Sequence, residues 1–356
     1  MSEIKLPGGR MIGPGHPCFI TAEIGQNHQG DVYTALRLAK AAHEAGVDAI
    51  KLCKRDISSD MTQAMRNSPY TGPQSFGPTY GKHREALELS PKEYAHLRRR
   101  LEYNLWPEIL FATVCDCQSV DDIEAVINPP LYKIASRDLD NLPLLSYVAR
   151  LGKPIVLSTG MATGGQIERA LEIIHKCHDK TILLYCVSEY PTLDEHVSLR
   201  EMRRLSECFD VPIGFSDHTP GIVYAQAAAA LGAVMIEKHI TLSRAMPGTD
   251  HAAALEPDGL RRLVKNIRLV EDAQHRDAVS LDLARTRAKL GRSLTTTRLI
   301  RPGTIIVPDM FALKSPGDGI PYADLGSVCG CVARVSIPTD CTLQWSDLQT
   351  PAPKGT

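Results

Sequence analysis

The sequence contains neither a long apolar run nor a block of basic residues. No stretch of its 356 residues approaches the roughly 20 consecutive apolar residues that a membrane helix requires. Its 40 lysine and arginine residues nearly balance 41 aspartate and glutamate residues, which gives a formal net charge of −1. These features argue against nucleic acid and against a membrane as partners.

Signal-peptide features and disulfide features are also lacking. Residues 1–15 are polar and rich in glycine, without the apolar core of a signal peptide. Ten cysteines are too dilute for a disulfide scaffold in a chain of this length. The pairs Cys115/Cys117 and Cys329/Cys331 do not have the usual zinc-site spacing. We therefore expect a cytoplasmic protein whose cysteines are reduced.

Eight apolar segments have the composition of parallel β-strands that are covered on both faces. Helix-like stretches follow most of them, and one begins with the capping-box pattern Ser90-Pro91-Lys92-Glu93. Eight β–α repeats within about 260 residues predict an α/β fold, the (β/α)8 TIM barrel. The predicted strands are Cys18–Ile24, Asp48–Cys53, Ile109–Val114, Leu131–Ala135, Pro154–Ser158, Thr181–Val187, Val211–Phe215 and Ala233–His239. The other predicted helices are Val32–Ala45, Gln166–Cys177, Leu199–Phe209, Gly221–Gly232 and Pro257–Ala273.

The character of the sequence changes after Ala273. We expect a catalytic barrel at residues 1–273, a charged helical linker at 274–290 and a small β-rich domain at 291–350, where turn formers break short β-prone pieces. A domain of about 60 residues has a marginal core of its own. It is therefore expected to pack on a barrel, either its own or a partner's.

Two histidines follow the last two predicted strands. Taken singly, a histidine at such a place is most often a polar loop residue. His218 and His239, however, end neighbouring strands, and Asp217 and Glu237 stand beside them. Chemistry in a TIM barrel is placed at the carboxyl ends of the strands. Two imidazoles with water or a carboxylate suit a divalent transition metal, although the spacing does not identify which one.

Other chemically capable residues occur at the remaining strand ends. Lys51 and Lys133 lie within apolar strands, where an isolated buried ammonium group is costly and needs a partner. One interpretation is that each lysine forms a structural salt bridge. Two lysines beside hydroxyl groups also make a site for a phosphate and a carboxylate. A Schiff-base lysine, as in class I aldolases, is a third reading, which a metal site would make unnecessary. The other strand ends carry Glu23, Thr113, Ser136, Ser158, Ser188 and Tyr190.

One predicted connection, Lys54–Leu89, is unusually long. Long structured loops on a barrel are usually lids or binding loops, although an oligomer contact is an equal alternative here. Its aromatic and basic residues would suit a polar, anionic ligand. They are Tyr70, Phe76, Tyr80, Lys82, His83 and Arg84.

Several motifs resemble those of the sialic acid (N-acetylneuraminate) synthase family, and the match spans nearly the whole chain in order. The motifs are Ala22–Gly30 (AEIGQNHQG), Leu157–Met161 (LSTGM), Gly214–Thr219 (GFSDHT) and Glu237–Thr241 (EKHIT). Residues 293–348 are similar to the family's antifreeze-like (SAF, β-clip) domain. The long loop and Gly248–Pro257 (GTDHAAALEP) are similar to the animal-type branch.

The resemblance implies a reaction between phosphoenolpyruvate and N-acetylmannosamine, or its 6-phosphate. The products would be N-acetylneuraminate, or its 9-phosphate, and inorganic phosphate. It further implies a homodimer in which the small domain of one chain caps the barrel of the other. His218 and His239 would bind a divalent cation, usually Mn²⁺, with Mg²⁺ or Co²⁺ as alternatives. Phosphoenolpyruvate would be held by Lys51, Thr113, Lys133, Ser136, Ser158 and Ser188. Glu23, Tyr190 and Asp250 would contact the sugar, and Glu237 would lie beside the metal.

The sequence departs from the family pattern at positions that bear on sugar recognition. Cys53 stands where glutamine is usual, and Ser188 where asparagine is common. Ser315 takes the place of an arginine that the small domain of many bacterial members sends to the sugar. Lys314 and Arg292 are the candidates to replace that arginine.

Two questions about the substrate stay open. Arg137 and the long loop are candidates to bind a 6-phosphate. A synthase of legionaminic or pseudaminic acid is the nearest alternative function. A Schiff-base aldolase or lyase using Lys133 or Lys51, and a non-catalytic sugar-binding protein, are alternatives of other classes.

Overall fold

The computed structural model describes residues 3–277 and 283–349. The chain divides into two compact units, residues 1–275 and 276–356. In the described ranges, no helix combines the length and the apolar character that crossing a membrane requires.

The first unit contains a closed barrel of eight parallel strands, in the order β10-β3-β4-β5-β6-β7-β8-β9. The predicted TIM barrel is therefore confirmed, and every strand lies within two residues of its predicted bounds. The strands are β3 (Phe19–Gly25), β4 (Ala49–Lys54), β5 (Ile109–Val114), β6 (Tyr132–Ile134), β7 (Ile155–Ser158), β8 (Thr181–Tyr185), β9 (Ile213–Asp217) and β10 (Met235–His239).

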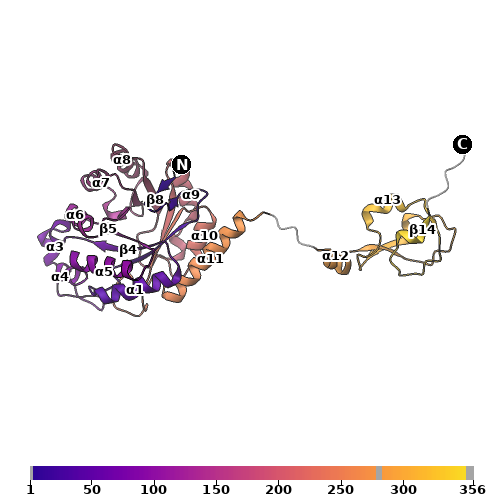
Figure 1. Cartoon of the computed structure of the whole chain (residues 1–356), viewed down its shortest axis with the longest axis horizontal. Helices are drawn as coiled ribbons and strands as arrows, with labels where there is room; N and C mark the ends of the chain where they lie inside the picture. The colour runs from indigo at the N-terminus through magenta and orange to yellow at the C-terminus, as the bar shows by residue number, and fades with distance from the viewer. Residues whose placement is uncertain (1–2, 278–282, 350–356) are drawn as a thin grey trace. The chain divides into compact units, whose positions relative to one another are not determined.

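Helices surround the barrel on the outside (Figure 1). Local signals set their ends: Asp31 caps the first turn of α1, Gly46 ends that helix in the left-handed conformation, and Ser90 and Glu93 form the predicted capping box of α5. The helices are α1 (Val32–Ala45), α5 (Pro91–Tyr103), α6 (Cys117–Val126), α7 (Leu142–Ala149), α8 (Gly164–His175), α9 (Leu199–Cys208), α10 (Val223–Ala230) and α11 (Pro257–His275).

Side chains alternate between the barrel interior and the helix layer, as the period of a strand requires. At the amino ends of the strands the interior is apolar, with Phe19, Phe111 and Met235 in one buried cluster. A short hairpin, β1 (Ile4–Lys5) with β2 (Met11–Ile12), adds its apolar side chains to that cluster. The interior at the amino end is thus filled by apolar side chains.

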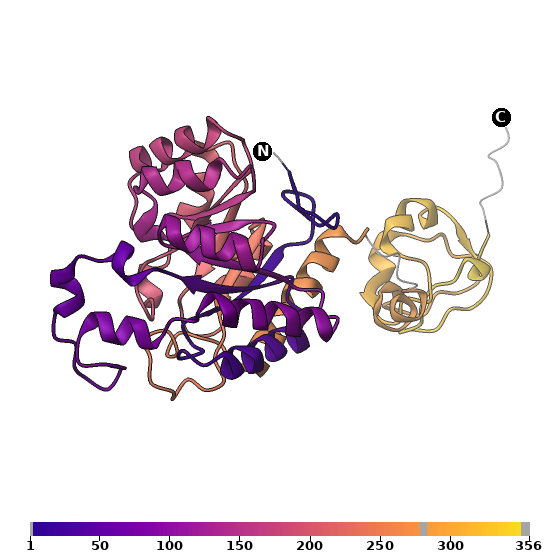
Figure 2. The same cartoon turned by 60° about the vertical axis from the view of Figure 1, so that its left-hand side comes forward.

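The segment after β4 forms three short helices and extends away from the strands (Figure 2). Its own side chains fix its shape: buried His83 accepts the Phe76 N–H at 3.1 Å and packs on the Tyr70 ring, 4.5 Å between centroids. Gly30, with φ of +74°, lies so close to Ala86 that a Cβ would collide with its carbonyl oxygen. The helices are α2 (Ile57–Asp60), α3 (Gln63–Asn67) and α4 (Tyr80–Ala86).

The second unit is the predicted small β-rich domain. Its core is a separate cluster of nine buried apolar side chains, including Leu294, Ile306 and Leu343. Helix α12 (Ala284–Leu290) precedes it, α13 (Leu325–Val328) lies within it, and its antiparallel strand pairs are β11 (Ser293–Thr296) with β12 (Phe311–Lys314) and β13 (Val332–Ala333) with β14 (Leu348–Gln349).

Candidate active site

A cavity of about 610 Å³ opens at the carboxyl ends of the barrel strands. This volume is in the range of small-molecule sites. Thirteen strand-end and loop residues that were predicted for the catalytic and substrate-binding site line it. They are Glu23, Lys51, Thr113, Lys133, Ser136, Arg137, Ser158, Ser188, Tyr190, His218, Glu237, His239 and Asp250.

Two buried ammonium groups share one buried carboxylate at the floor of this cavity. Lys133 Nζ lies 2.7 Å from Glu237 Oε1, and Lys51 Nζ lies 3.5 Å from Glu237 Oε2. Lys51 also pairs with Glu23 and donates a hydrogen bond to Thr113 Oγ1 at 2.7 Å. Two positive and two negative charges, from β3, β4, β6 and β10, therefore meet at the floor of the cavity, so that neither lysine is buried without a partner.

The protonation of these groups follows from their burial and their mutual charge. Burial lowers the pKa of Lys51 to about 8, against the opposing effect of Glu237. Burial alone would raise the pKa of Glu237, but Lys133 and Lys51 hold it well below its ordinary value. At neutral pH Lys51 is mostly charged and Glu237 is ionised, so the cavity keeps cationic groups that can receive an anion.

The two predicted metal ligands lie side by side, with 5.7 Å between ring centroids. His218 Nδ1 lies 2.8 Å from the Val187 carbonyl oxygen, which can only accept, so Nδ1 carries the proton and Nε2 keeps its lone pair. His239 Nδ1 is buried and has no hydrogen-bond partner among the described residues. Burial also lowers the pKa of His218 to about 4, which keeps its ring neutral, the form that binds metals.

The histidine pair fits a divalent cation held by two protein ligands. In the part of the chain that the structure describes, no group of three or more histidine, cysteine, aspartate or glutamate residues has a metal-binding arrangement. Further coordination positions would therefore belong to water and substrate, as in catalytic metal sites with open positions.

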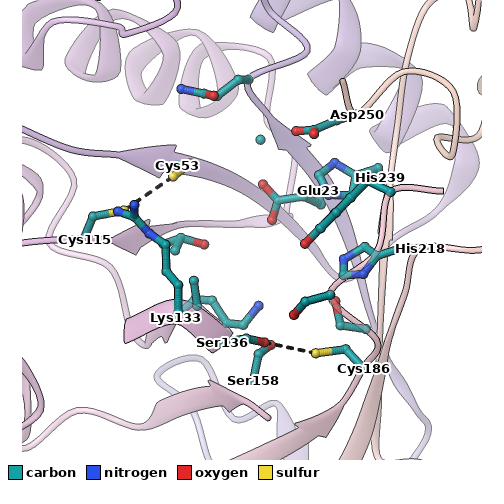
Figure 3. A pocket seen from close by; sticks show the side chains of 18 of the residues that line it. Glu23, Cys53, Cys115, Lys133, Ser136, Ser158, Cys186, His218, His239 and Asp250 are labelled. Atoms are coloured by element: carbon teal, nitrogen blue, oxygen red, sulfur yellow. Dashed lines mark hydrogen bonds between the residues drawn. The ribbon is translucent and has the colours of Figure 1, made fainter. Parts of the chain in front are cut away.

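The cavity has two chemically distinct sides (Figure 3). Glu23, His218, His239 and Asp250 gather on one side, and an added Cβ at Gly25 would lie 3.1 Å from both Glu23 Oε1 and His239 Cε1. Lys133, Ser136 and Ser158 lie together on the other side. Ser136 Oγ accepts the Gly160 N–H at 3.0 Å and lies 3.2 Å from Cys186 Sγ. Tyr190 covers His218, with 4.1 Å between ring centroids.

Asp217 does not lie beside the histidines in the cavity, so the sequence-based expectation is wrong for this residue. It forms a fully buried ion pair with Lys238, at 2.8 Å, and accepts hydrogen bonds from Thr219. The reason is the alternation of the strands. Glu237 and His239 point inward, so Lys238 between them points outward, and Asp217 faces outward with it.

Cys53, which departs from the family pattern, lines the cavity together with several residues that were not predicted. Cys53 Sγ lies 3.8 Å from Cys115 Sγ and 3.2 Å from Arg55 Nη2. The hydrogen bond with Cys115 and the charge of Arg55 lower the pKa of the Cys53 thiol. A signal for two of them exists in the sequence, because Cys115 is two residues beyond Thr113 and Ser216 is two before His218. The unpredicted lining residues also include Gly25, Gln26, Ala135, Met161, Cys186 and Thr249.

The long loop contributes only part of its predicted set to the cavity. Tyr80 and Arg84, both on α4, line it. Lys82 does not, and it pairs instead with Glu85 at 2.6 Å on the surface. The remaining aromatic residues pack around His83 within the loop.

The sequence matches the NeuB family over residues 38–278 and the SAF domain over residues 291–349. It is 37% identical over 347 residues to N-acetylneuraminate-9-phosphate synthase of Homo sapiens, covering 96% of this chain and 95% of that protein. It is 31% identical to N,N'-diacetyllegionaminic acid synthase of Legionella pneumophila, covering 98% and 99%. A solved structure of N-acetylneuraminic acid (sialic acid) synthetase from Leptospira borgpetersenii aligns with a TM-score of 0.68 and 31% identity, over 80% of this chain and 94% of that one.

Proposed function

We propose that this chain, which belongs to the NeuB family, condenses phosphoenolpyruvate with an N-acetylhexosamine to form a nonulosonic acid. The observation that carries the proposal is that two buried ammonium groups, of Lys51 and Lys133, line the same cavity as two histidines. We favour N-acetylmannosamine 6-phosphate as the sugar and N-acetylneuraminate 9-phosphate as the product, because the human relative at 37% identity carries that name. The unphosphorylated sugar and the legionaminic and pseudaminic types are the competing substrates.

In the proposed reaction, carbon 3 of phosphoenolpyruvate bonds to the aldehyde carbon of the sugar, and the aldehyde oxygen takes up a proton. Carbon 2 becomes positively charged, and water adds there and releases a proton. The tetrahedral carbon then loses inorganic phosphate by cleavage of its C–O bond, which leaves the ketone of the product.

The residues of the cavity match the charges in this reaction. Lys51 and Lys133 can bind the carboxylate and the phosphate of phosphoenolpyruvate, with hydroxyl groups from the same side of the cavity as further donors. Glu23 and Glu237 are fixed by the two lysines, and their negative charge can stabilise the positive charge that develops at carbon 2. Asp250 and Tyr190 would contact the sugar; both line the cavity, and Tyr190 packs on His218.

We further propose that His218 and His239 hold a divalent cation, with Mn²⁺ expected and Mg²⁺ or Co²⁺ as alternatives. Such a cation, when bound, would polarise the aldehyde oxygen of the sugar as a Lewis acid. The free Nε2 of His218 and the unpartnered Nδ1 of His239 support this assignment.

The function is tested by phosphate release from phosphoenolpyruvate with a panel of N-acetylhexosamines, each with and without a 6-phosphate. We expect release only with mannosamine-type sugars, together with a nine-carbon acid that mass spectrometry identifies. Borohydride treatment with pyruvate should leave the mass of the chain unchanged. A covalent pyruvyl adduct on Lys51 or Lys133 would instead support the Schiff-base alternative.

The metal assignment is tested by His218→Ala and His239→Ala. Each substitution should reduce the bound metal, measured by mass spectrometry of the intact complex, and lower turnover at least about 100-fold. Circular dichroism should stay unchanged. His175→Ala, an exposed histidine on α8, serves as the control that keeps metal and activity. Full activity after treatment with a strong chelator would contradict the assignment.

We also propose a homodimer in which the small domain of one chain covers the barrel of the other. The described part of the small domain has a core cluster of nine buried apolar residues, and it exposes Ile305, Tyr322 and Trp345 by 61%, 60% and 51%. Such apolar surface favours a partner. The cytoplasmic location stays a prediction.

Sedimentation velocity should give a particle of twice 39.0 kDa at micromolar concentration. Activity per chain should fall on dilution, in step with dissociation of that particle. A monomer that keeps full activity per chain would rule out the shared site.

A further inference from the structure

Arg84 is an arginine of the cavity without a carboxylate partner. The cavity is lined by three arginines, at positions 55, 84 and 137. Arg55 lies 3.1 Å from Glu88, and Arg137 pairs with Asp60 and Asp138. Throughout residues 3–277 and 283–349, no acidic side chain forms an ion pair with Arg84. Its positive charge is therefore available to a ligand.

Neutral groups fix the direction of this guanidinium. Nε and Nη2 donate to the Tyr80 hydroxyl at 3.0 and 2.8 Å, and Nη1 donates to Gln26 Oε1. The carbon of the guanidinium also lies 5.1 Å from the centroid of the Tyr80 ring. Gln26 is held in turn by Glu88, at 3.3 Å. Arg84 is thus positioned before any ligand arrives, which lowers the entropy cost of binding.

The remaining donors match a phosphate group. A guanidinium has five N–H donors, and the contacts above use one on Nε, one on Nη1 and one on Nη2. One N–H on each terminal nitrogen is left. Two such donors on one planar group bind a phosphate or a carboxylate in a bidentate manner.

Arg84 belongs to the sugar side of the cavity. Its Nη1 donates to Gln26, the residue after Gly25, and a Cβ added at Gly25 would lie 3.1 Å from both Glu23 Oε1 and His239 Cε1. Thr249, beside Asp250, also lines the cavity. Lys133, Ser136 and Ser158, which would receive phosphoenolpyruvate, lie on the opposite side of the cavity (Figure 3). Arg84 therefore serves an anion carried by the second substrate.

We propose that Arg84 binds the phosphate of a 6-phosphorylated N-acetylhexosamine and so determines the preference of the enzyme for the phosphorylated sugar. This inference rests on the proposed function and specifies its second substrate. An arginine that forms no ion pair within the described residues can discriminate between the two sugars, because the neutral 6-hydroxyl cannot form an ion pair with it.

The test compares Arg84→Gln with the wild type in kcat/KM for N-acetylmannosamine 6-phosphate and for N-acetylmannosamine, at saturating phosphoenolpyruvate. The wild type should prefer the phosphorylated sugar. Arg84→Gln should reduce that preference about 10- to 100-fold through KM, the range of a charge-assisted hydrogen bond, with little change in KM for phosphoenolpyruvate. Arg84→Lys should retain part of the preference. The matched control is Lys82→Gln, which removes an exposed charge from the same helix and should change nothing.

Binding of an unreactive ligand gives a second measurement without turnover. The reduced sugar 2-acetamidomannitol 6-phosphate should bind the wild type, in the presence of phosphoenolpyruvate, about 10- to 100-fold more tightly than Arg84→Gln by calorimetry. Its phosphate-free form should bind both equally. A thermal melt confirms that the variant is folded.

The outcomes separate the inference from the function on which it rests. An equal effect of Arg84→Gln on both sugars, or a wild type that prefers the unphosphorylated sugar, would overturn the role of Arg84 and leave the synthase function intact. No phosphate release with any hexosamine would overturn the proposed function itself.

Discussion

The site depends on one electrostatic constraint. The two buried ammonium groups at the carboxyl end of the barrel need buried carboxylates beside them to balance their charge. Glu237 does this for both, at 2.7 Å from Lys133 and 3.5 Å from Lys51, and Glu23 supports Lys51. Breaking a buried pair by removing one partner typically costs about 3–5 kcal/mol. Glu237 and Glu23 therefore stabilise the two charged lysines in the cavity, where an anionic ligand can contact them.

Because side chains alternate along a strand, neighbouring residues of one strand face either the cavity or the helix layer. On β10, Glu237 and His239 face the cavity, whereas Lys238 faces the helix layer and forms its own ion pair with Asp217. The same alternation places apolar side chains at the amino end of the barrel, where the β1–β2 hairpin completes the core. A filled amino end and a polar carboxyl end place the candidate active site at the carboxyl end, where it is built from residues far apart in the sequence.

Much of this could be predicted from the sequence, because strands buried on both faces are continuous apolar runs whose ends are marked by polar residues. The eight strands and the lining residues at their ends follow from that pattern. Asp217 was misplaced because adjacency to His218 was given more weight than the two-residue period. The β1–β2 hairpin escaped prediction because two-residue strands have no periodicity to detect. The sequence could not show that Arg84 forms no ion pair within the described residues. Which arginine of the cavity pairs with which carboxylate is decided by contacts between segments that are distant in the chain.

The most direct test of the central claim is the proton uptake that accompanies binding of phosphoenolpyruvate. Lys51, with a pKa of about 8, is protonated below that pH and mostly neutral at pH 9. An anion that binds against it must raise this pKa, so binding at pH 9 should take up nearly one proton per site, and far less at pH 7. Calorimetry in two buffers of different ionisation enthalpy measures this uptake, and Lys51→Arg should abolish it. Binding at pH 9 without proton uptake would contradict the account.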